Sequence, residues 1–512
     1  MDIAIPAGHC PIPWSEELFT LSRRHGPRLA IKDADSELTY QALCSQAHRL
    51  AQWLLAQAPG HRPPRVGVLL QNSRASVVAD YGISIAGGSL VHLNPACAAG
   101  ELSHCLSLVP VDLVLTETAL APRLAALDVP VHVQWQAHAA AMPEVSGPLP
   151  PADPAVPGRI LYTSGTSGPP KAVVYSHFKR WTAAVLLRAT LPYRPEGTGI
   201  LLMTPYVHGA SMLARAYLDT GGWVALHQGV QARAVEQALR EPALDAVFAP
   251  PSVLAKLLDT CRPARPLRCI FSGTQPLPRS LYQRARERFG ACIRVTYGKS
   301  ENFNPISILE IAEGADLYTD PALDRQQGCC VGLPAPGVSL RIADDGEVLL
   351  RSQHMYDGYL THEGWLPHAG DAWHATGDLG RFDARGRLWL TGRKTLVINT
   401  GGYKINPEEP ADRIRAVPAV ADALVVGIAS DYWTEIPVCG YVPAQGAQVS
   451  EDMLRDAVAD LTPYKQPRLY LPLADMPSNA VGKPSPQGLR DYIARHYILH
   501  DGPRPRLEPG RP

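Results

Sequence analysis

Short apolar runs alternate with segments of helical periodicity along the first three-quarters of this chain. Residues 66–70 form an apolar run, a helical segment follows at 74–86, and residues 89–93 form the next apolar run. Residues 112–116 and 245–248 are further apolar runs with a helical segment nearby. Strands that alternate with helices are typical of parallel sheets whose faces the helices cover. We therefore expect an α/β fold with a large N-terminal domain of parallel-rich sheets and flanking helices.

The pattern changes near Gly392, which predicts a second domain. At 512 residues the chain is too long for one compact core. Beyond Gly392, apolar runs at 423–427 and 437–441 accompany a helical segment around 452–461, as in a small α+β unit. The expected division is an N-terminal domain at 1–392, a hinge at 393–395, a C-terminal domain at 396–500 and a disordered tail at 501–512, which is rich in Pro, Gly and Arg.

Composition disfavours several classes of protein. The formal net charge is zero, so there is no global attraction to nucleic acid or to an anionic membrane. No uninterrupted apolar run approaches the ~20 residues of a membrane span, and the first residues do not resemble a secretory signal. The ten cysteines contain no Cys-x-x-Cys pair, so neither a zinc site nor a disulfide framework is expected. We expect a cytoplasmic enzyme with reduced thiols, no nucleic-acid partner and no membrane insertion.

A loop dense in small hydroxyl residues follows the apolar run 160–162. It consists of Thr163, Ser164, Gly165, Thr166, Ser167 and Gly168, and two prolines separate it from Lys171. Such a loop turns backbone N–H groups and hydroxyls toward one point, which makes a cradle for phosphate oxygens with the lysine at its rim. A Walker-type ATPase needs four residues between its glycines and a lysine directly after the second. Because Gly165 and Gly168 stand three positions apart, that class is disfavoured.

With this loop the chain resembles the adenylate-forming superfamily, which includes acyl- and aryl-CoA ligases and the adenylation domains of peptide synthetases. The superfamily's loop is Tyr-Thr-Ser-Gly-Thr-Thr-Gly-x-Pro-Lys-Gly, from which this chain departs at Ser167 and Ala172. Further motifs follow in the family's order, and the resemblance runs from residues 38–40 to Arg490. It implies a large AMP-binding domain and a small, mobile C-terminal domain.

The resemblance implies that two segments of the large domain contact the nucleotide. Ser272, Gly273 and Thr274 correspond to a segment that lies against the adenine and the acyl pocket. The motif at 297–301 contains Tyr297, Gly298, Ser300 and Glu301. Its tyrosine would lie near the adenine, and its serine would offer a hydroxyl to the α-phosphate. Its glutamate would hold Mg²⁺, an ion that prefers hard oxygen ligands.

The remaining motifs lie at the domain boundary and beyond. Asp378 would accept hydrogen bonds from both ribose hydroxyls, and Arg393 resembles an arginine that also reaches the ribose. The hinge falls at Thr395, where relatives usually carry Asp or Lys. Gly401 and Gly402 resemble the loop that CoA ligases bring to the active site for thioester formation, and a plain hairpin turn is the alternative.

Two further residues are implied for the reacting groups. Lys483 ends a C-terminal motif and corresponds to a lysine that contacts the reacting phosphate and carboxylate oxygens. His208 resembles the gate between the ATP and acyl sites, with a buried structural histidine as the alternative. Lys299 either meets a second anionic group of the substrate or faces solvent. Residues 205–211 lack the carboxylate that pairs with a substrate ammonium, which disfavours an α-amino acid.

These residues predict an acid–thiol ligase with Lys483, Lys171, Glu301 and His208 in the catalytic roles. Retention of the family's charged residues disfavours a silent nucleotide-binding relative. The predicted reaction activates a small aryl or short polar carboxylic acid with ATP, releases pyrophosphate, and transfers the acyl group from the adenylate to CoA. The expected cofactors are ATP, Mg²⁺ and CoA. A stand-alone ligase that loads the phosphopantetheine of a free-standing acyl carrier protein is the alternative, because both acceptors present the same thiol.

Overall fold

The computed structural model describes residue 3 and residues 9–58, 62–162, 171–261, 265–320, 328–400, 403–479 and 483–510. The chain forms two compact units. The N-terminal unit comprises Met1–Thr319, Gly332–Ser339 and Arg351–Trp373. The C-terminal unit comprises Asp320–Val331, Leu340–Leu350 and His374–Pro512. Strands β15 (Cys329–Pro334), β16 (Val338–Ile342) and β17 (Glu347–Ser352) each contain residues of both units.

One sheet of the N-terminal unit is built around parallel strands. In order of pairing these are β13 (Ile293–Lys299), β12 (Cys269–Gly273), β11 (Leu244–Phe248), β9 (Gly199–Leu202), β10 (Trp223–Leu226) and β1 (Leu29–Lys32). β14 (Asn302–Leu309) pairs antiparallel with β13, and β2 (Glu37–Thr39) with β1. Every residue of β9, β10, β11 and β12 is buried, as expected of parallel strands covered on both faces.

A second sheet carries the strand that leads into the predicted phosphate loop. β7 (Pro157–Tyr162), β4 (Ser89–His92), β3 (Arg65–Leu69), β5 (Leu113–Thr116) and β6 (Val131–His132) pair in parallel in that order. β8 (Ala172–Ser176), β18 (Gly358–Thr361) and β19 (Gly364–Pro367) continue the sheet from β7 with antiparallel pairing. A strand from 358–361 therefore lies beside the strand that follows Lys171.

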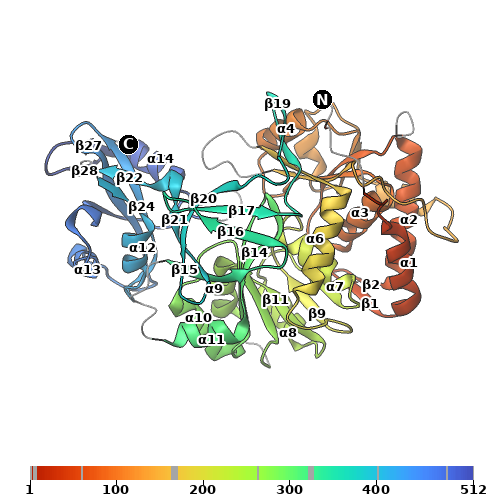
Figure 1. Cartoon of the computed structure of the whole chain (residues 1–512), viewed down its shortest axis with the longest axis horizontal. Helices are drawn as coiled ribbons and strands as arrows, with labels where there is room; N and C mark the ends of the chain where they lie inside the picture. Colours follow the sequence, from red (N-terminus) through yellow and green to blue (C-terminus); the bar gives the residue numbers. More distant parts are fainter. Residues whose placement is uncertain are drawn as a thin grey trace. The chain divides into compact units, whose positions relative to one another are not determined.

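Helices pack on these sheets and bury most of their apolar side chains. They are α1 (Trp14–His25), α2 (Tyr40–Gln57), α3 (Arg74–Ile85), α4 (Ala99–Leu108), α5 (Trp135–Ala140), α6 (His177–Ala189), α7 (Gly209–Leu218), α8 (Ala232–Arg240), α9 (Pro251–Thr260), α10 (Arg279–Phe289) and α11 (Ile311–Thr319), with a 3₁₀ turn at Ala121–Leu124. Helices α1, α2 and α3, red and orange in Figure 1, pack together. The Thr39 hydroxyl accepts from the backbone N–H of Ala42, 3.2 Å away, and so caps the start of α2.

The C-terminal unit contains a five-stranded sheet between two hydrophobic clusters (Figure 1, blue). Its strands are β23 (Tyr403–Ile405), β22 (Ile398–Thr400), β25 (Thr434–Pro443), β24 (Val420–Ser430) and β26 (Leu469–Pro472). Alternate side chains of β24 face opposite ways, since Val425 belongs to one cluster and Val426 to the other. The covering helices are α12 (Glu408–Arg415), α13 (Glu451–Ala457) and α14 (Pro486–His496). The unit also contains the paired strands β20 (His374–Phe382) and β21 (Leu388–Arg393), and 3₁₀ turns at Lys394–Leu396 and Pro463–Lys465.

The predicted fold class is confirmed, with parallel-rich sheets in a large N-terminal unit and a small α+β unit after it. The disordered tail is wrong for the part of 501–512 that the structure describes. β27 (Tyr497–His500) pairs antiparallel with β28 (Arg506–Pro509), and the Asp501 carboxylate accepts from the Ser430 hydroxyl at 2.6 Å. The boundary near 392 and the hinge at 393–395 stay predictions. No helix within the described ranges is long and apolar enough to cross a membrane.

Candidate active site

The predicted phosphate loop is bounded by two paired strands. Its residues Thr163, Ser164, Gly165, Thr166, Ser167 and Gly168 lie outside the described residues. β7 ends at Tyr162, opposite Ala172 of β8, and the Tyr162 hydroxyl donates to the Cys105 carbonyl at 2.7 Å. Lys171 directly precedes β8, and its ammonium lies 5.4 Å from the centre of the Tyr359 ring, a cation–π contact.

Glu301 lies in the tight connection between the antiparallel strands β13 and β14 and is 9% exposed. The Tyr359 hydroxyl donates to its Oε1 at 2.7 Å, and the Tyr356 backbone N–H donates to its carbonyl at 3.0 Å. Burial and the neighbouring Glu301 carboxylate raise the pKa of Tyr359, so its hydroxyl keeps its proton at neutral pH. One tyrosine therefore contacts both the predicted phosphate lysine and the predicted magnesium carboxylate.

The donor set around Glu301 fits a magnesium ion that shares its ligands with a nucleotide. Mg²⁺ usually takes one or two carboxylates and completes its shell with phosphate oxygens and water. Within the described ranges no group of three or more His, Cys, Asp or Glu could hold a metal ion, so an all-protein cage is not found there. A single oriented carboxylate is the ligand that such an ion needs from the protein.

The predicted adenine segment lies at the carboxyl ends of β12 and β13, the edge where open α/β sheets bind ligands. Gly273 is opposite Thr296, and a Cβ at Gly273 would stand 2.6 Å from the Thr296 carbonyl oxygen, so only glycine fits. Thr274 has φ +70°, a left-handed conformation that is rare for a β-branched residue. The Ser272 hydroxyl is buried and has no hydrogen-bond partner among the described residues.

The 297–301 motif forms the end of β13 and its turn. Tyr297 is buried, whereas Gly298 is exposed and a Cβ there would meet nothing within 4 Å. The Ser300 carbonyl accepts from the Tyr175 hydroxyl at 2.6 Å, which ties the turn to β8. Lys299 is half-buried at the end of β13, and its contact with substrate stays a prediction.

His208 directly precedes α7 and is exposed, which contradicts the alternative of a buried structural histidine. Its role as a gate stays a prediction.

The predicted ribose residues face each other across β20 and β21. Asp378 is buried and lies opposite Arg393, and the Arg393 Nε is 3.1 Å from its Oδ1. The Lys394 ammonium lies 2.6 Å from Asp345 and 2.8 Å from Glu347, and these two carboxylates raise its pKa. Ion pairs thus hold Arg393 and Lys394, which directly precede Thr395, to carboxylates of the C-terminal unit.

The two remaining predicted segments lie elsewhere in the C-terminal unit. Gly401 and Gly402 fall outside the described residues, between the paired strands β22 and β23. Near Lys483, the backbone N–H of Asn479 donates to the Lys483 carbonyl at 2.8 Å, and the Asn479 side chain accepts from the Lys483 N–H at 3.0 Å. The Lys483 side chain is half-buried.

Two tyrosines that contact the predicted site were not found from the sequence. Tyr359 holds Glu301 from β18, and Tyr175 holds the Ser300 carbonyl from β8. A tyrosine in a short strand has the pattern of an ordinary core residue, so no sequence signal separates these two from the rest. Strand pairing that brings distant segments together creates their contacts.

Comparison with known proteins gives consistent matches over nearly the whole chain. A family model described as AMP-binding enzyme matches residues 18–360, and one described as AMP-binding enzyme C-terminal domain matches residues 412–483. The indoleacetate–CoA ligase of Aromatoleum aromaticum is 27% identical over 92% of this chain and 96% of its own. A 2-succinylbenzoate–CoA ligase of Bacillus cereus is 26% identical over 91% of this chain and 96% of its own.

Solved structures show the same fold. The o-succinylbenzoate CoA synthetase of Bacillus subtilis, in complex with its acyl-adenylate intermediate, has a TM-score of 0.80 at 24% identity and covers 94% of this chain and 98% of its own. The amide bond synthetase of Marinactinospora thermotolerans has a TM-score of 0.79 at 25% identity. The match covers 94% of this chain and 100% of the synthetase chain.

Proposed function

This chain belongs to the AMP-binding enzyme family, and from that membership we propose that it is an AMP-forming acid–CoA ligase. Its relatives over more than nine-tenths of the chain include ligases that join carboxylic acids to CoA. The observation that supports the proposal most directly is the meeting of Lys171 and Glu301 at Tyr359, because these are the two charged groups that a nucleotide with its metal ion requires.

In the first step a carboxylate oxygen of the acid attacks the α-phosphorus of ATP. A bond forms between that oxygen and phosphorus, the bond to pyrophosphate breaks, and an acyl-adenylate results. Two anions must approach each other, so the barrier is largely electrostatic and positional. Lys171 and Lys483 bind the phosphate and carboxylate oxygens, and Glu301 would hold a magnesium ion, which would supply positive charge to the phosphate oxygens. Asp378 and Arg393 hold the ribose.

In the second step the CoA thiol loses its proton to water and its sulfur bonds to the acyl carbon, and AMP leaves as the bond between the acyl carbon and the phosphate oxygen breaks. Gly401 and Gly402 present the thiol in this step, after the C-terminal unit turns about Thr395 and withdraws Lys483. Such a movement lets one pocket serve two reactions in succession. CoA is preferred to a carrier protein as the acceptor because the named relatives are CoA ligases.

The substrate we propose is a small aryl carboxylic acid. Indoleacetate and 2-succinylbenzoate, the acids for which two relatives are named, both carry an aromatic ring. The region around His208 contains no carboxylate that could pair with a substrate ammonium, which argues against an α-amino acid.

A panel of aryl and short polar acids tests the proposal. Each acid is offered with ATP and Mg²⁺, pyrophosphate release is measured, and active acids are repeated with CoA and with a phosphopantetheinylated carrier protein. We expect acid-dependent pyrophosphate release and a CoA thioester. Lys483→Ala should lower the first rate by roughly 10²–10³, the usual cost of removing a preorganised electrostatic contact. Absence of AMP and of any adenylate across the panel would overturn the proposal, and thioester formation on the carrier alone would overturn CoA as the acceptor.

A further inference from the structure

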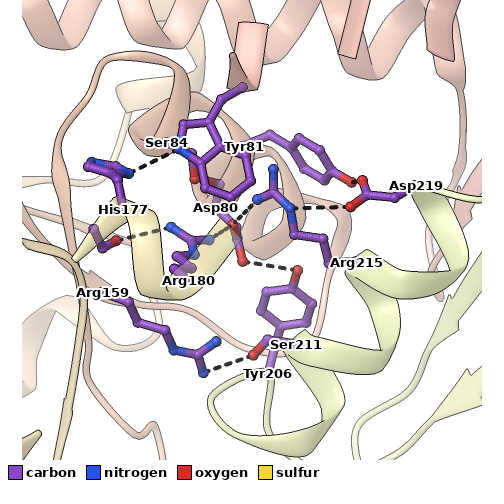
Figure 2. Close-up of polar contacts among 12 residues, drawn as sticks. Asp80, Tyr81, Ser84, Arg159, His177, Arg180, Tyr206, Ser211, Arg215 and Asp219 are labelled. Carbon is purple, nitrogen blue, oxygen red and sulfur yellow. Dashed lines mark hydrogen bonds and ion pairs between the residues drawn. The ribbon is translucent and has the colours of Figure 1, made fainter. Parts of the chain in front are cut away.

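One buried arginine connects three segments of the candidate site. Arg159 stands on β7, which leads into the predicted phosphate loop, and is 2% exposed. Its Nη2 donates to the Val207 carbonyl and, at 3.0 Å, to the Ser211 hydroxyl (Figure 2 draws the latter bond). Its guanidinium also lies 4.8 Å from the centre of the Phe303 ring. Val207 directly precedes His208, and Phe303 lies two residues after Glu301.

A second hydrogen bond extends this contact to His208 itself. The Ser211 hydroxyl, which accepts from Arg159, donates to the His208 carbonyl at 2.8 Å. Arg159 therefore holds two consecutive carbonyls, one directly and one through a hydroxyl. The His208 backbone, with φ −112° and ψ −118°, is neither helical nor extended, and its side chain makes no capping bond to α7. The His208 carbonyl also accepts from the backbone N–H of Met212 at 3.4 Å, and the contacts with Arg159 join this helix start to β7.

The charge of Asp80 acts on Arg159, but its carboxylate forms ion pairs with other arginines. Asp80, the buried carboxylate in Figure 2, pairs with Arg180 and, at 3.0 Å, with Arg215. In the part of the chain that the structure describes, no carboxylate lies within ion-pair distance of Arg159. Burial, and then the charge of Arg180, lower its pKa to about 10 against the opposing charge of Asp80, which still leaves it protonated at neutral pH.

Burying a cation without a carboxylate is costly, and an apolar side chain would fill this space at a lower cost. What an apolar side chain cannot supply is a donor such as the guanidinium Nη2, which donates to a carbonyl and a hydroxyl at the same time. We infer that Arg159 is a positioning residue that fixes His208 at the acid-binding site. The assignment of His208 to the acid rests on the proposed function, whereas the hold on residues 207–211 does not.

Two substitutions separate the hydrogen bonds of Arg159 from its charge. Arg159→Lys keeps the positive charge but replaces the planar guanidinium, whose Nη2 donates to both acceptors, by a shorter ammonium side chain. Ser211→Ala keeps Arg159 and its bond to the Val207 carbonyl but removes the hydroxyl that links Arg159 to the His208 carbonyl. Hydrogen–deuterium exchange of the full chain should become faster in peptides covering 203–212 in both variants. Peptides of α13, in the other unit, should exchange as in the wild type. With an acid that the wild type activates, Arg159→Lys should raise KM for the acid roughly 10- to 100-fold, as expected for a lost hydrogen bond to a charged group, and leave KM for ATP within about twofold.

His208→Ala supplies the second control. If Arg159 acts through His208, Arg159→Lys should add little to KM for the acid when His208 is already absent. Unchanged exchange at 203–212 in both variants, equal changes in KM for acid and ATP, or a full additional effect in the His208→Ala background would each overturn the inference. Ser211→Ala carries the test if Arg159→Lys does not fold. A wild type that activates no acid overturns the proposed function alone, since the exchange measurement still decides whether Arg159 holds this segment.

Discussion

Tyr359 makes two contacts at the site that substitution can separate. Phenylalanine keeps the ring near Lys171 and removes the hydroxyl that holds Glu301, whereas leucine removes both. We expect Tyr359→Phe to raise the Mg²⁺ concentration for half-maximal pyrophosphate release about tenfold, the effect of one hydrogen bond to a charged acceptor. Tyr359→Leu should also raise KM for ATP, because the lysine loses its aromatic contact. Titrations of Mg²⁺ and of ATP check this, and identical behaviour of the two variants would contradict it.

His177 makes the N-terminal unit sensitive to acid. Its ring is fully buried, and its Nδ1 accepts from the Trp14 indole N–H at 3.0 Å. Burial, and then the nearby Arg180, lower its pKa from 6.5 to about 3. Between these values the unfolded chain binds a proton that the folded chain does not. Stability is therefore full above about pH 6.5 and falls by about 1.4 kcal/mol for each pH unit below it.

His177→Asn keeps an acceptor for Trp14 and removes the titrating ring. Between pH 6.5 and 4.5, we expect the Tm of this variant to fall less steeply than that of the wild type. Thermal unfolding at a series of pH values measures the difference. The other buried histidines contribute equally to both proteins, so parallel slopes would show that His177 is not a source of the acid sensitivity.

For individual residues, the sequence predicted which side chains the chemistry needs but not which neighbouring residues hold those side chains in place. The motif around Tyr297 and Glu301 could be recognised because its residues are contiguous. The contact of Glu301 with Tyr359 could not, because 58 residues separate them and only the pairing of β18 with β8 brings the tyrosine to the site. Arg159 shows the same limit, since a charged residue in an apolar run gives no sign of its partners at 207 and 211.

Among the elements, the buried parallel strands could be predicted best. An apolar run with a helical segment behind it is a local pattern, and β3, β4, β5 and β11 all occur within a residue of their predicted places. The tail could not be predicted in this way. Its composition is typical of disorder, but the Asp501 carboxylate accepts from the Ser430 hydroxyl and from the backbone N–H of Asp431 at 2.7 Å. These two partners lie 71 and 70 residues earlier in the chain.

Gly332 on β15 is required by the close approach of β14. Its φ is +81°, and a Cβ would stand 1.9 Å from the Ile308 carbonyl oxygen. Gly229 has φ +68° but open space around it. Gly229→Ala should therefore cost only the left-handed conformation, about 1–2 kcal/mol, and Gly332→Ala should cost about 1–3 kcal/mol more for the overlap. Denaturant unfolding of the two variants measures both values, and equal losses would contradict the close approach.

For the whole molecule, the proposed two-step reaction depends on rotation at Thr395. This residue lies in the 3₁₀ turn Lys394–Leu396. Proline fixes φ and removes an N–H, so Thr395→Pro should slow thioester formation at least tenfold more than adenylation. Pyrophosphate release and CoA thioester are measured separately in the same preparation. Thr395→Asp, which introduces the residue common in relatives, is the control and should preserve both steps. Equal loss of both steps in the proline variant would contradict the two-pose proposal.

The division of the chain into two units could be predicted because the hydrophobic pattern changes along the sequence. Which unit each segment belongs to could not be predicted. Residues 320–331 and 340–350 group with the C-terminal unit although they precede the predicted boundary at Gly392. Strand pairing decides such membership, and it joins residues that no local window contains.

The buried set of Asp80, Arg180 and Arg215 limits how descendants of this chain can diverge. Three helices, α3, α6 and α7, each contribute one member. Loss of one arginine leaves Asp80 paired with the other. Loss of Asp80, or of the last arginine that pairs with it, leaves a buried charge without its partner at a cost of about 3–5 kcal/mol, a large part of what keeps a typical domain folded. An all-apolar set can fold equally well, but every route to it by single substitutions crosses that barrier. Lineages should therefore inherit the three positions together or exchange them together.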